Sequence, residues 1–300
     1  MRKYCDSLTA YARAATRPVA VGSVVIGGGN PVRIQSMTNT DTNDTEASAA
    51  QVRRIAGAGG EIVRLTAQGR REAANLAAIR ARLREEGCSV PLVADIHFVP
   101  EAALVAAEHV EKVRINPGNF NDRGSQFDRL VALCREHGTA LRIGVNHGSL
   151  SAAVMERYGD TPEGMVASAV EYLGLCRERG FDPVVVSLKS SNVRVMVQAY
   201  RLLAAEMRER GWDYPLHLRR HGGAHQVGGG HRRAAGRRSR RHDPRLADRG
   251  ARARNSSRTA AGRLLCRPRG TRADSGRGRI VLLAVRIPPP PLGAGGGRRR

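Results

Sequence analysis

Apolar residues follow two spacings along the first two thirds of the chain. Short runs of Val, Ile and Leu alternate with longer stretches in which apolar residues recur every three or four positions. The short runs are typical of buried strands, and the longer spacing is typical of amphipathic helices. The predicted strands are 32–37, 61–66, 91–97, 112–116, 140–146 and 183–189, and the predicted helices are 50–58, 72–86, 101–109, 127–137, 165–179 and 193–210.

This alternation predicts an α/β fold with parallel strands joined by crossover helices. Six strand–helix units are complete by residue 210, and a seventh strand begins at 214–218. A closed (β/α)8 barrel has eight such units. We therefore predict a TIM-type barrel that is incomplete, with about six to seven units. A doubly wound sheet is the alternative, but its glycine fingerprint is missing from the sequence.

Strand-like residues at 18–26 precede the glycine-rich segment 27–30, and the strand at 32–37 follows it. This order predicts a small hairpin with a Gly/Asn turn that leads into the first barrel strand. A phosphate-binding loop is the other interpretation of the glycines, but they have neither of the two usual phosphate-loop spacings.

The periodic pattern ends at residue 219. Residues 219–300 contain 23 arginines, three aspartates, no lysine, no glutamate and no aromatic residue. Apart from the apolar run that begins at Ile280, neither helical nor strand spacing is present. Such a composition buries too little apolar surface to offset chain entropy. We predict a barrel domain over 1–218 and a disordered Arg/Gly/Pro-rich tail over 219–300.

The net charge of +23 suggests a protein that binds nucleic acid, until the charge is located. The tail carries +20 of it and the barrel part only +3. The five cysteines are widely spaced, and the N-terminus has no apolar leader core. These features predict a cytoplasmic protein that does not insert into a membrane.

Polar residues interrupt the apolar runs at the carboxyl ends of the predicted strands. Because residues two apart in a strand share a face, these side chains should ring the C-terminal mouth of the barrel. They come in pairs on five strands: Arg64 with Thr66, Asp95 with His97, Arg114 with Asn116, Arg142 with Asn146, and Ser187 with Lys189.

Three arginines and a lysine at one mouth predict an anionic ligand, because a buried cluster of cations needs a counter-charge. Asp95 is the chief carboxylate on these strand ends. Guanidinium groups suit phosphate oxygens, so a small, doubly charged phosphorylated molecule fits. Alternatively, each arginine pairs with a helix carboxylate outside the barrel. Asp95 and His97 are too few ligands for a metal, and orientation of substrate or a proton relay is the interpretation we adopt.

Read in order, these strand ends resemble one enzyme family, the 4-hydroxy-3-methylbut-2-en-1-yl diphosphate synthases. The resemblance covers about residues 15–218. The matching segments are 32–40 (VRIQSMTNT), 94–98 (ADIHF), 113–119 (VRINPGN), 142–150 (RIGVNHGSL), 158–162 (YGDTP) and 187–192 (SLKSSN).

The resemblance implies an oxidoreductase of the non-mevalonate pathway of isoprenoid biosynthesis. Its substrate would be 2-C-methyl-D-erythritol 2,4-cyclodiphosphate, opened with two electrons from reduced flavodoxin or ferredoxin. By this resemblance Arg64, Arg114, Arg142 and Lys189 would hold the diphosphate. Asn116, Asn146 and Ser187 would bond to it, and Asp95 and His97 would face the reacting carbons. Family members are commonly homodimers.

The sequence departs from the family after Leu218. The family's 4Fe–4S cluster is held by three cysteines and a glutamate of a separate domain, whereas residues 219–300 contain only Cys266 and no glutamate. This chain is therefore expected to lack the cluster, to be inactive and to bind its substrate weakly, and its dimerisation is in question. Two other interpretations stay open: a pterin-binding barrel of the dihydropteroate synthase type, and a non-enzymatic protein whose basic tail binds nucleic acid.

A shift of reading frame near Leu218 would explain the tail, and this is testable. Residues 219–223 (RRHGG) can be encoded by a string that, read one base later, gives the family's continuation Gly-Val-Thr-Glu. We expect resequencing of the DNA around codon 218 to restore that continuation. A continuous frame with ordinary codon usage through the tail would contradict the hypothesis.

Overall fold

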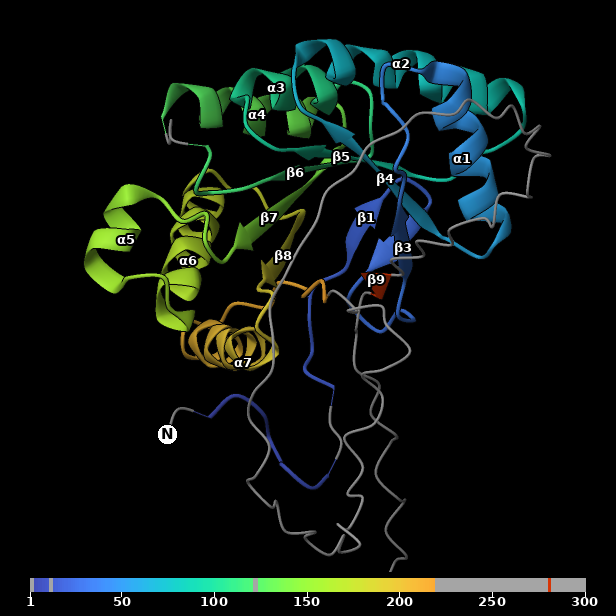
Figure 1. Cartoon of the computed structure of the whole chain (residues 1–300). Helices are drawn as coiled ribbons and strands as arrows, with labels where there is room; N and C mark the ends of the chain where they lie inside the picture. The colour runs from blue at the N-terminus through green and yellow to red at the C-terminus, as the bar shows by residue number, and fades with distance from the viewer. Residues whose placement is uncertain (1–2, 11–12, 121–123, 219–279, 282–300) are drawn as a thin grey trace, which may run out of the picture. The chain divides into compact units, whose positions relative to one another are not determined.

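The computed structural model describes residues 3–10, 13–120, 124–218 and 280–281. Six parallel strands each precede a helix, as the sequence predicts (Figure 1). The strands are β3 (Ile34–Met37), β4 (Ile62–Ala67), β5 (Leu92–Ile96), β6 (Lys112–Ile115), β7 (Ala140–Asn146) and β8 (Val184–Lys189). The helices that follow them are α1 (Thr45–Gly57), α2 (Arg70–Glu85), α3 (Pro100–Ala107), α4 (Ser125–Glu136), α6 (Pro162–Glu178) and α7 (Val193–Glu209).

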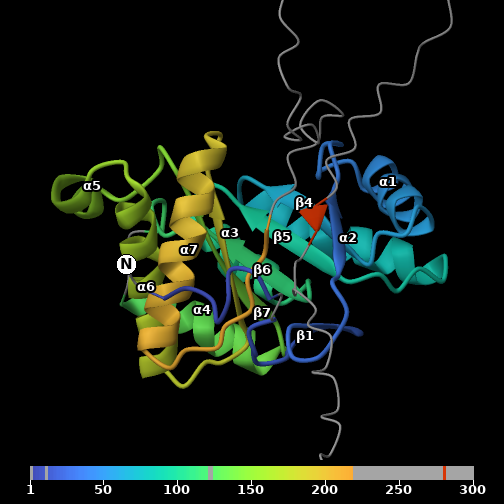
Figure 2. The ribbon, with the colours of Figure 1, turned by 90° about the horizontal axis from the view of Figure 1, so that it is seen from below.

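Neighbouring strands follow sequence order from β3 to β8, with each pair parallel. The sheet is curved and the helices cover its outer face (Figures 1 and 2). We call β3–β8 and their helices the half-barrel. The predicted seventh strand begins as one parallel bridge between Val186 and Leu216. The predicted incomplete TIM-type barrel is therefore confirmed.

At the other edge of the sheet, β9 (Ile280–Val281) pairs with β3 in the antiparallel direction. It lies in the apolar run that the sequence singles out within 219–300. The predictions made for the rest of that segment, including disorder and the frame shift, lie outside the described residues.

Side chains alternate between two environments along each strand, which explains why the strands form where they do. On β4, Val63, Leu65 and Ala67 point outward and pack against the helices. The intervening Ile62 points inward and packs in a second, smaller core. Because successive side chains point to opposite faces, each strand packs one apolar face against the helices. Its other face points to the interior of the half-barrel.

A hairpin closes the inner side of the half-barrel at the N-terminal ends of the strands. Its strands are β1 (Val19–Val21) and β2 (Val24–Ile26), and three of its apolar side chains pack with Ile62, Val93, Ala140 and Val185. The predicted hairpin is therefore present, but its turn lies at Gly22 and Ser23 and not at 27–30. Segment 27–30 instead connects β2 to β3, as a plain turn in which Gly27 has φ of +79°.

Arg17, just before the hairpin, ties the start of the half-barrel to its last part. Its guanidinium makes ion pairs with Asp182 and Asp213, and its backbone N–H donates to the carbonyl of Asp213 at 2.9 Å. The first and last parts of the half-barrel are thus joined at its base.

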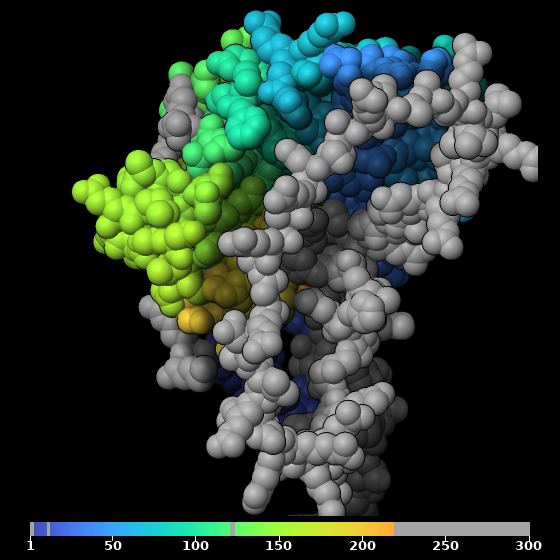
Figure 3. Space-filling model, viewed as in Figure 1, coloured from blue at the N-terminus to red at the C-terminus, as the bar shows by residue number. Residues whose placement is uncertain are grey.

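Short polar side chains begin several helices. Asp44 accepts from the N–H of Ala47 at the start of α1, and Thr161 accepts from that of Gly164 at the start of α6. The extra helix α5 (Ala152–Tyr158), which projects beside α6 in Figures 1 and 3, was not predicted. Among the described residues, no helix combines the length and apolar character that a bilayer crossing requires.

Truncation of Leu65 tests the outer core. Leu65 is fully buried on the outward face of β4. Because Leu65→Ala leaves a cavity, we expect it to lower the free energy of unfolding by about 2–5 kcal/mol in urea denaturation. Val193→Ala, at a side chain that is 42% exposed on α7, is the control and should change it by less than about 0.5 kcal/mol. Equal effects of the two substitutions would contradict this placement of the core.

Candidate functional site

The inner face of the half-barrel carries a layer of polar side chains above the apolar floor made by the hairpin. Inward positions are two residues apart along each strand, and every side chain of this layer occupies such a position. All but Arg64 are more than nine tenths buried. The members of this layer are Gln35 on β3, Arg64 on β4, Asp95 on β5, Lys112 and Arg114 on β6, Arg142 on β7 and Ser187 on β8.

Asp95 lies between two arginines. Its Oδ1 accepts from Arg114 Nη1 at 3.0 Å, and its Oδ2 lies 3.3 Å from Arg64 Nε. Burial raises the pKa of Asp95, but the charges of Arg64, Arg114 and Arg142 outweigh that effect and lower it. The carboxylate is therefore ionised, and it fixes the positions of two guanidinium groups.

Arg114 donates to three acceptors through its two terminal nitrogens. Its Nη2 donates to the carbonyl of Gly144 at 2.7 Å and to Asn146 Oδ1 at 3.1 Å. A Cβ at Gly144 would lie 2.3 Å from Arg114 Nε, so only glycine leaves room for the guanidinium at this point of β7.

Arg142 is buried with fewer hydrogen-bond partners than Arg114. Its Nε donates to Ser187 Oγ at 2.8 Å, whereas its Nη1 has no hydrogen-bond partner among the described residues. Burial and the charges of Arg64 and Arg114 lower the pKa of Arg142 to about 9. The group is still charged at neutral pH, so it presents a buried cation with one unused donor.

Lys112 lies in the same layer and was missed by the sequence analysis, although it stands two residues before Arg114. Its Nζ donates to Gln35 Oε1 at 3.2 Å. Burial, Arg142 and Arg64 together lower the pKa of Lys112 well below its usual value. Of the described groups in this layer, four are basic and one is acidic.

The remaining predicted residues lie towards the C-terminal ends of the strands. Asn116 donates to Ser149 Oγ at 3.0 Å. The half-buried ring of His97 has its Nδ1 3.3 Å from the backbone oxygen of Asp95. Lys189 is exposed at the end of β8. The predicted pairs therefore lie on one face of the strands. The alternative that Arg64, Arg114 and Arg142 pair with helix carboxylates outside the barrel is wrong.

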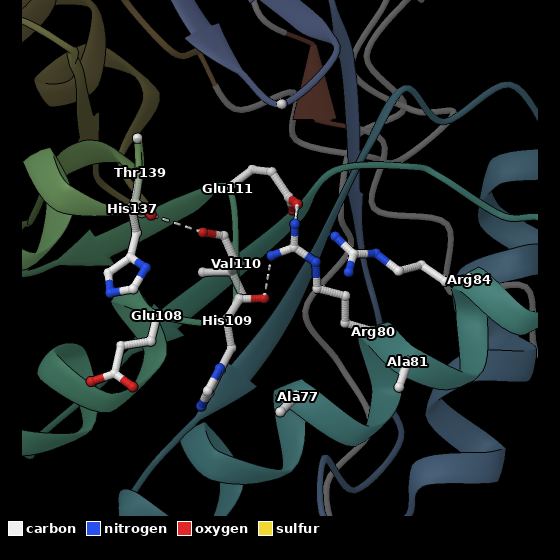
Figure 4. A pocket seen from close by; sticks show the side chains of 12 residues that line it. Ala77, Arg80, Ala81, Arg84, Glu108, His109, Val110, Glu111, His137 and Thr139 are labelled. Atoms are coloured by element: carbon white, nitrogen blue, oxygen red, sulfur yellow. Dashed lines mark hydrogen bonds and ion pairs between the residues drawn. The ribbon is translucent and has the colours of Figure 1, made fainter.

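The opposite end of the half-barrel has a hollow of about 560 Å³ between α2 and the segments that lead into β6 and β7 (Figure 4). Here Arg80 is paired with Glu111 and donates to the carbonyl of His109 at 2.8 Å. Because this arginine already has a carboxylate partner, the hollow lacks the charge imbalance of the inner layer.

The described residues do not suit an iron–sulfur cluster. No three His, Cys, Asp or Glu side chains among them are grouped as metal ligands. Cluster ligation requires thiolates. Burial raises the pKa of the Cys134 thiol to about 12, and it also raises that of Cys176 to about 12, although there the charge of Arg179 opposes the effect. These two cysteines pack in the outer core.

Comparison with known protein sequences identifies the family of this chain. A family model described as the GcpE TIM-barrel domain matches residues 16–228. A 4-hydroxy-3-methylbut-2-en-1-yl diphosphate synthase (flavodoxin) of Akkermansia muciniphila is 50% identical over 249 residues, which is 76% of this chain and 42% of that protein. A chloroplastic synthase (ferredoxin) of Oryza sativa is 47% identical over 72% of this chain and 32% of its own length. The chain thus spans less than half the length of these relatives.

Solved structures resemble the chain only distantly. A truncated 3-deoxy-D-arabino-heptulosonate 7-phosphate synthase from Thermotoga maritima is 14% identical, with a TM-score of 0.44, and the match covers 67% of this chain and 68% of that one. A Plasmodium falciparum HPPK-DHPS with pterin and p-hydroxybenzoate is 10% identical, with a TM-score of 0.49 over 67% of this chain and 40% of that one. Likenesses of this size carry no argument about the ligand.

Removing the carboxylate of Asp95 tests the charge arrangement. Asp95→Asn leaves two buried guanidinium groups without a counter-charge, so we expect the free energy of unfolding to fall by about 3–5 kcal/mol. Because the folded-state pKa of Asp95 is lowered, its contribution is present above the unfolded pKa of about 4 and is lost as the pH falls through the folded value. Denaturation at several pH values should show this acid-dependent loss in the parent protein and not in the variant.

Asp128→Asn is the matched control for Asp95→Asn. The Asp128 carboxylate also pairs with an arginine, Arg179, but its side chain is 59% exposed. We expect this substitution to cost less than about 1 kcal/mol. If both substitutions cost the same, Asp95 has no special electrostatic role.

Proposed function

The chain belongs to the GcpE TIM-barrel domain family, and we propose on this basis that its half-barrel binds a small cyclic diphosphate on the inner face of the sheet. The observation that carries the proposal is the charge imbalance of the inner layer, where Arg64, Arg114 and Arg142 face the single carboxylate of Asp95 and Lys112 is a further buried base. A doubly charged anion would offset most of that imbalance, and guanidinium donors match phosphate oxygens.

Each predicted residue has a role in this proposal. Arg64 and Arg114, oriented by Asp95, would bind phosphate oxygens together with Arg142. Lys189 would add a charge at the rim, while Asn116, Asn146 and Ser187 would donate hydrogen bonds. His97 would lie beside the reacting carbons of the ligand. Both oxygens of Asp95 already face arginines, so this carboxylate would act mainly by positioning those arginines.

The names of the relatives point to one substrate and reaction. We infer that the whole protein takes 2-C-methyl-D-erythritol 2,4-cyclodiphosphate and opens it reductively to 4-hydroxy-3-methylbut-2-enyl diphosphate, as an oxidoreductase of isoprenoid biosynthesis. The relatives are named for flavodoxin or ferredoxin, and one of these would supply the two electrons. The cytoplasm remains the compartment that we propose.

Electron transfer is not assigned to the described residues. A family 4Fe–4S cluster would supply electrons to the bound ligand, but the cysteines of the half-barrel do not fit that group. In this proposal the inner layer binds and orients the diphosphate and excludes water from its buried oxygens. The carboxylate of Asp95 keeps its arginine partners charged. The half-barrel is therefore proposed as the substrate-binding part of the enzyme, and whether it assembles as a homodimer stays a prediction.

Arg142→Met tests binding. Replacing this buried cation removes charge-assisted hydrogen bonds worth about 1.5–3 kcal/mol each, so the affinity for the cyclic diphosphate should fall roughly 10- to 100-fold in calorimetry. The free energy of unfolding of the ligand-free protein should fall by no more than about 1 kcal/mol, because the substitution also removes a desolvated charge that neighbouring cations repel.

Two comparisons complete the binding test. Arg80→Met, at the opposite end of the half-barrel, loses the ion pair with Glu111 and should leave the affinity unchanged. Titration of the parent protein with a pterin should give no heat. Pterin binding without binding of the cyclic diphosphate would favour the dihydropteroate synthase alternative and overturn the proposal.

A further inference from the structure

His217, directly beyond β8, adds a further side chain to those of the inner layer. Leu216 forms the parallel bridge to Val186, and both Leu216 and Leu218 pack against the outer core. Because successive residues of an extended segment point to opposite faces, the side chain of His217 points inward, next to the position of Ser187. The imidazole is therefore in the same layer as the arginines, and it is 1% exposed.

The backbone holds His217 firmly in this place. Its N–H donates to the carbonyl of Val186 at 2.7 Å, and its own carbonyl accepts from the hydroxyl of Tyr200 on α7 at 2.6 Å. The same hydroxyl accepts from the N–H of Leu188 at 3.0 Å. The position of the ring is thus set by β8 and α7 and does not depend on a contact of the ring itself.

The ring has two unused polar atoms. Neither Nδ1 nor Nε2 of His217 has a hydrogen-bond partner within the part of the chain that the structure describes. Leaving buried polar atoms unpaired is unfavourable, so such groups usually mark a missing partner. Arg142 Nη1, Arg114 Nε and Gln35 Nε2 are unpaired as well, so unused donors predominate in the layer.

Burial and the charges around the ring of His217 determine its protonation state. Burial lowers the pKa of His217, and Arg142 on β7, Lys112 and Arg114 on β6 and Arg64 on β4 lower it further, to well below its usual value. The one carboxylate of the layer is that of Asp95 on β5, and the titratable group on α7 is Tyr200, whose pKa burial raises to about 12. In the free protein the imidazole is therefore neutral.

We propose that His217 is a further binding residue of this site, which takes up one proton from solvent when a diphosphate binds and then donates a hydrogen bond to a phosphate oxygen. The proposal rests on the proposed function, because the ligand must bring the negative charge. That charge offsets the repulsion by the four basic groups and makes the imidazolium form favourable. Both unused atoms of the ring would become donors, as an anion requires.

Proton uptake sets the direction of the pH dependence. A proton that is bound only in the complex favours the complex at low pH, so the affinity should weaken as the pH rises from the lowered pKa of His217 in the free protein to its pKa in the complex, and level off above that. The slope approaches about ten-fold per pH unit for one proton. Each phosphorus of a cyclic diphosphate carries one strongly acidic hydroxyl, so the charge of this ligand is constant near neutral pH and does not obscure the effect.

The experiment is calorimetry with 2-C-methyl-D-erythritol 2,4-cyclodiphosphate in two buffers of different ionisation enthalpy, at slightly acidic pH. The full chain should take up a fraction of one proton, seen as a buffer-dependent heat. His217→Gln should bind roughly ten-fold more weakly, with a heat that is the same in both buffers. His137→Gln, at an exposed histidine outside the layer, is the matched control and should behave as the parent protein.

The outcomes separate this proposal from the one on which it rests. No heat in either buffer overturns both, whereas binding with buffer-independent heat overturns only the role of His217. Lys112→Met distinguishes the other buried base: if it abolishes the uptake and His217→Gln does not, the proton goes to Lys112 and the proposal is wrong. Should His217→Gln not fold, imidazole NMR of the parent protein decides, because a ring that stays neutral in the complex contradicts the proposal.

Discussion

The ion pairs of Asp95 with Arg64 and Arg114 are the interaction on which the inner layer depends. Several basic groups in a space with little water repel one another, and one carboxylate between two of them limits that repulsion. Asp95 does not neutralise the layer, however. Arg142 keeps an unused donor, and the pKa of Lys112 is lowered well below its usual value by burial and by the charges of Arg142 and Arg64. The free protein therefore retains an excess of positive charge at the place where a ligand would bind.

The fold tolerates this excess because it keeps two cores separate. Outward side chains such as Leu65 pack against the helices, and the hairpin packs against Ile62 and its neighbours at the base. Both cores are apolar and lie apart from the inner layer, whose polar groups can then be arranged for binding. This division agrees with the general observation that functional sites depart from the rules that stabilise the rest of a protein.

Much of this arrangement could be predicted from the sequence. The two-residue period of the strands and the period of three to four residues of the helices both arise because apolar side chains are buried. The same rule put Arg64, Asp95, Arg114 and Arg142 on one face. It could also have found Lys112, which stands two residues before Arg114 in an apolar strand. The roles of Gly144 and Tyr200 could not be found in this way. They depend on contacts between elements far apart in the chain, with Arg114 and with the backbone of His217. The hairpin turn was misplaced because the Gly27–Asn30 run is a stronger local signal than Gly22 alone.

The tie between Arg17 and Asp213 has a consequence for how the protein is made. These two residues are 196 positions apart, so the base of the half-barrel closes only after nearly all of it has left the ribosome. Contacts of such long sequence separation form slowly, since a large loop must be ordered first. During that interval Val19, Val21 and Ile26 lack the partner that β8 supplies, Val185. The nascent chain therefore carries an apolar hairpin in need of protection, and chaperone demand in the cell should reflect this order of synthesis.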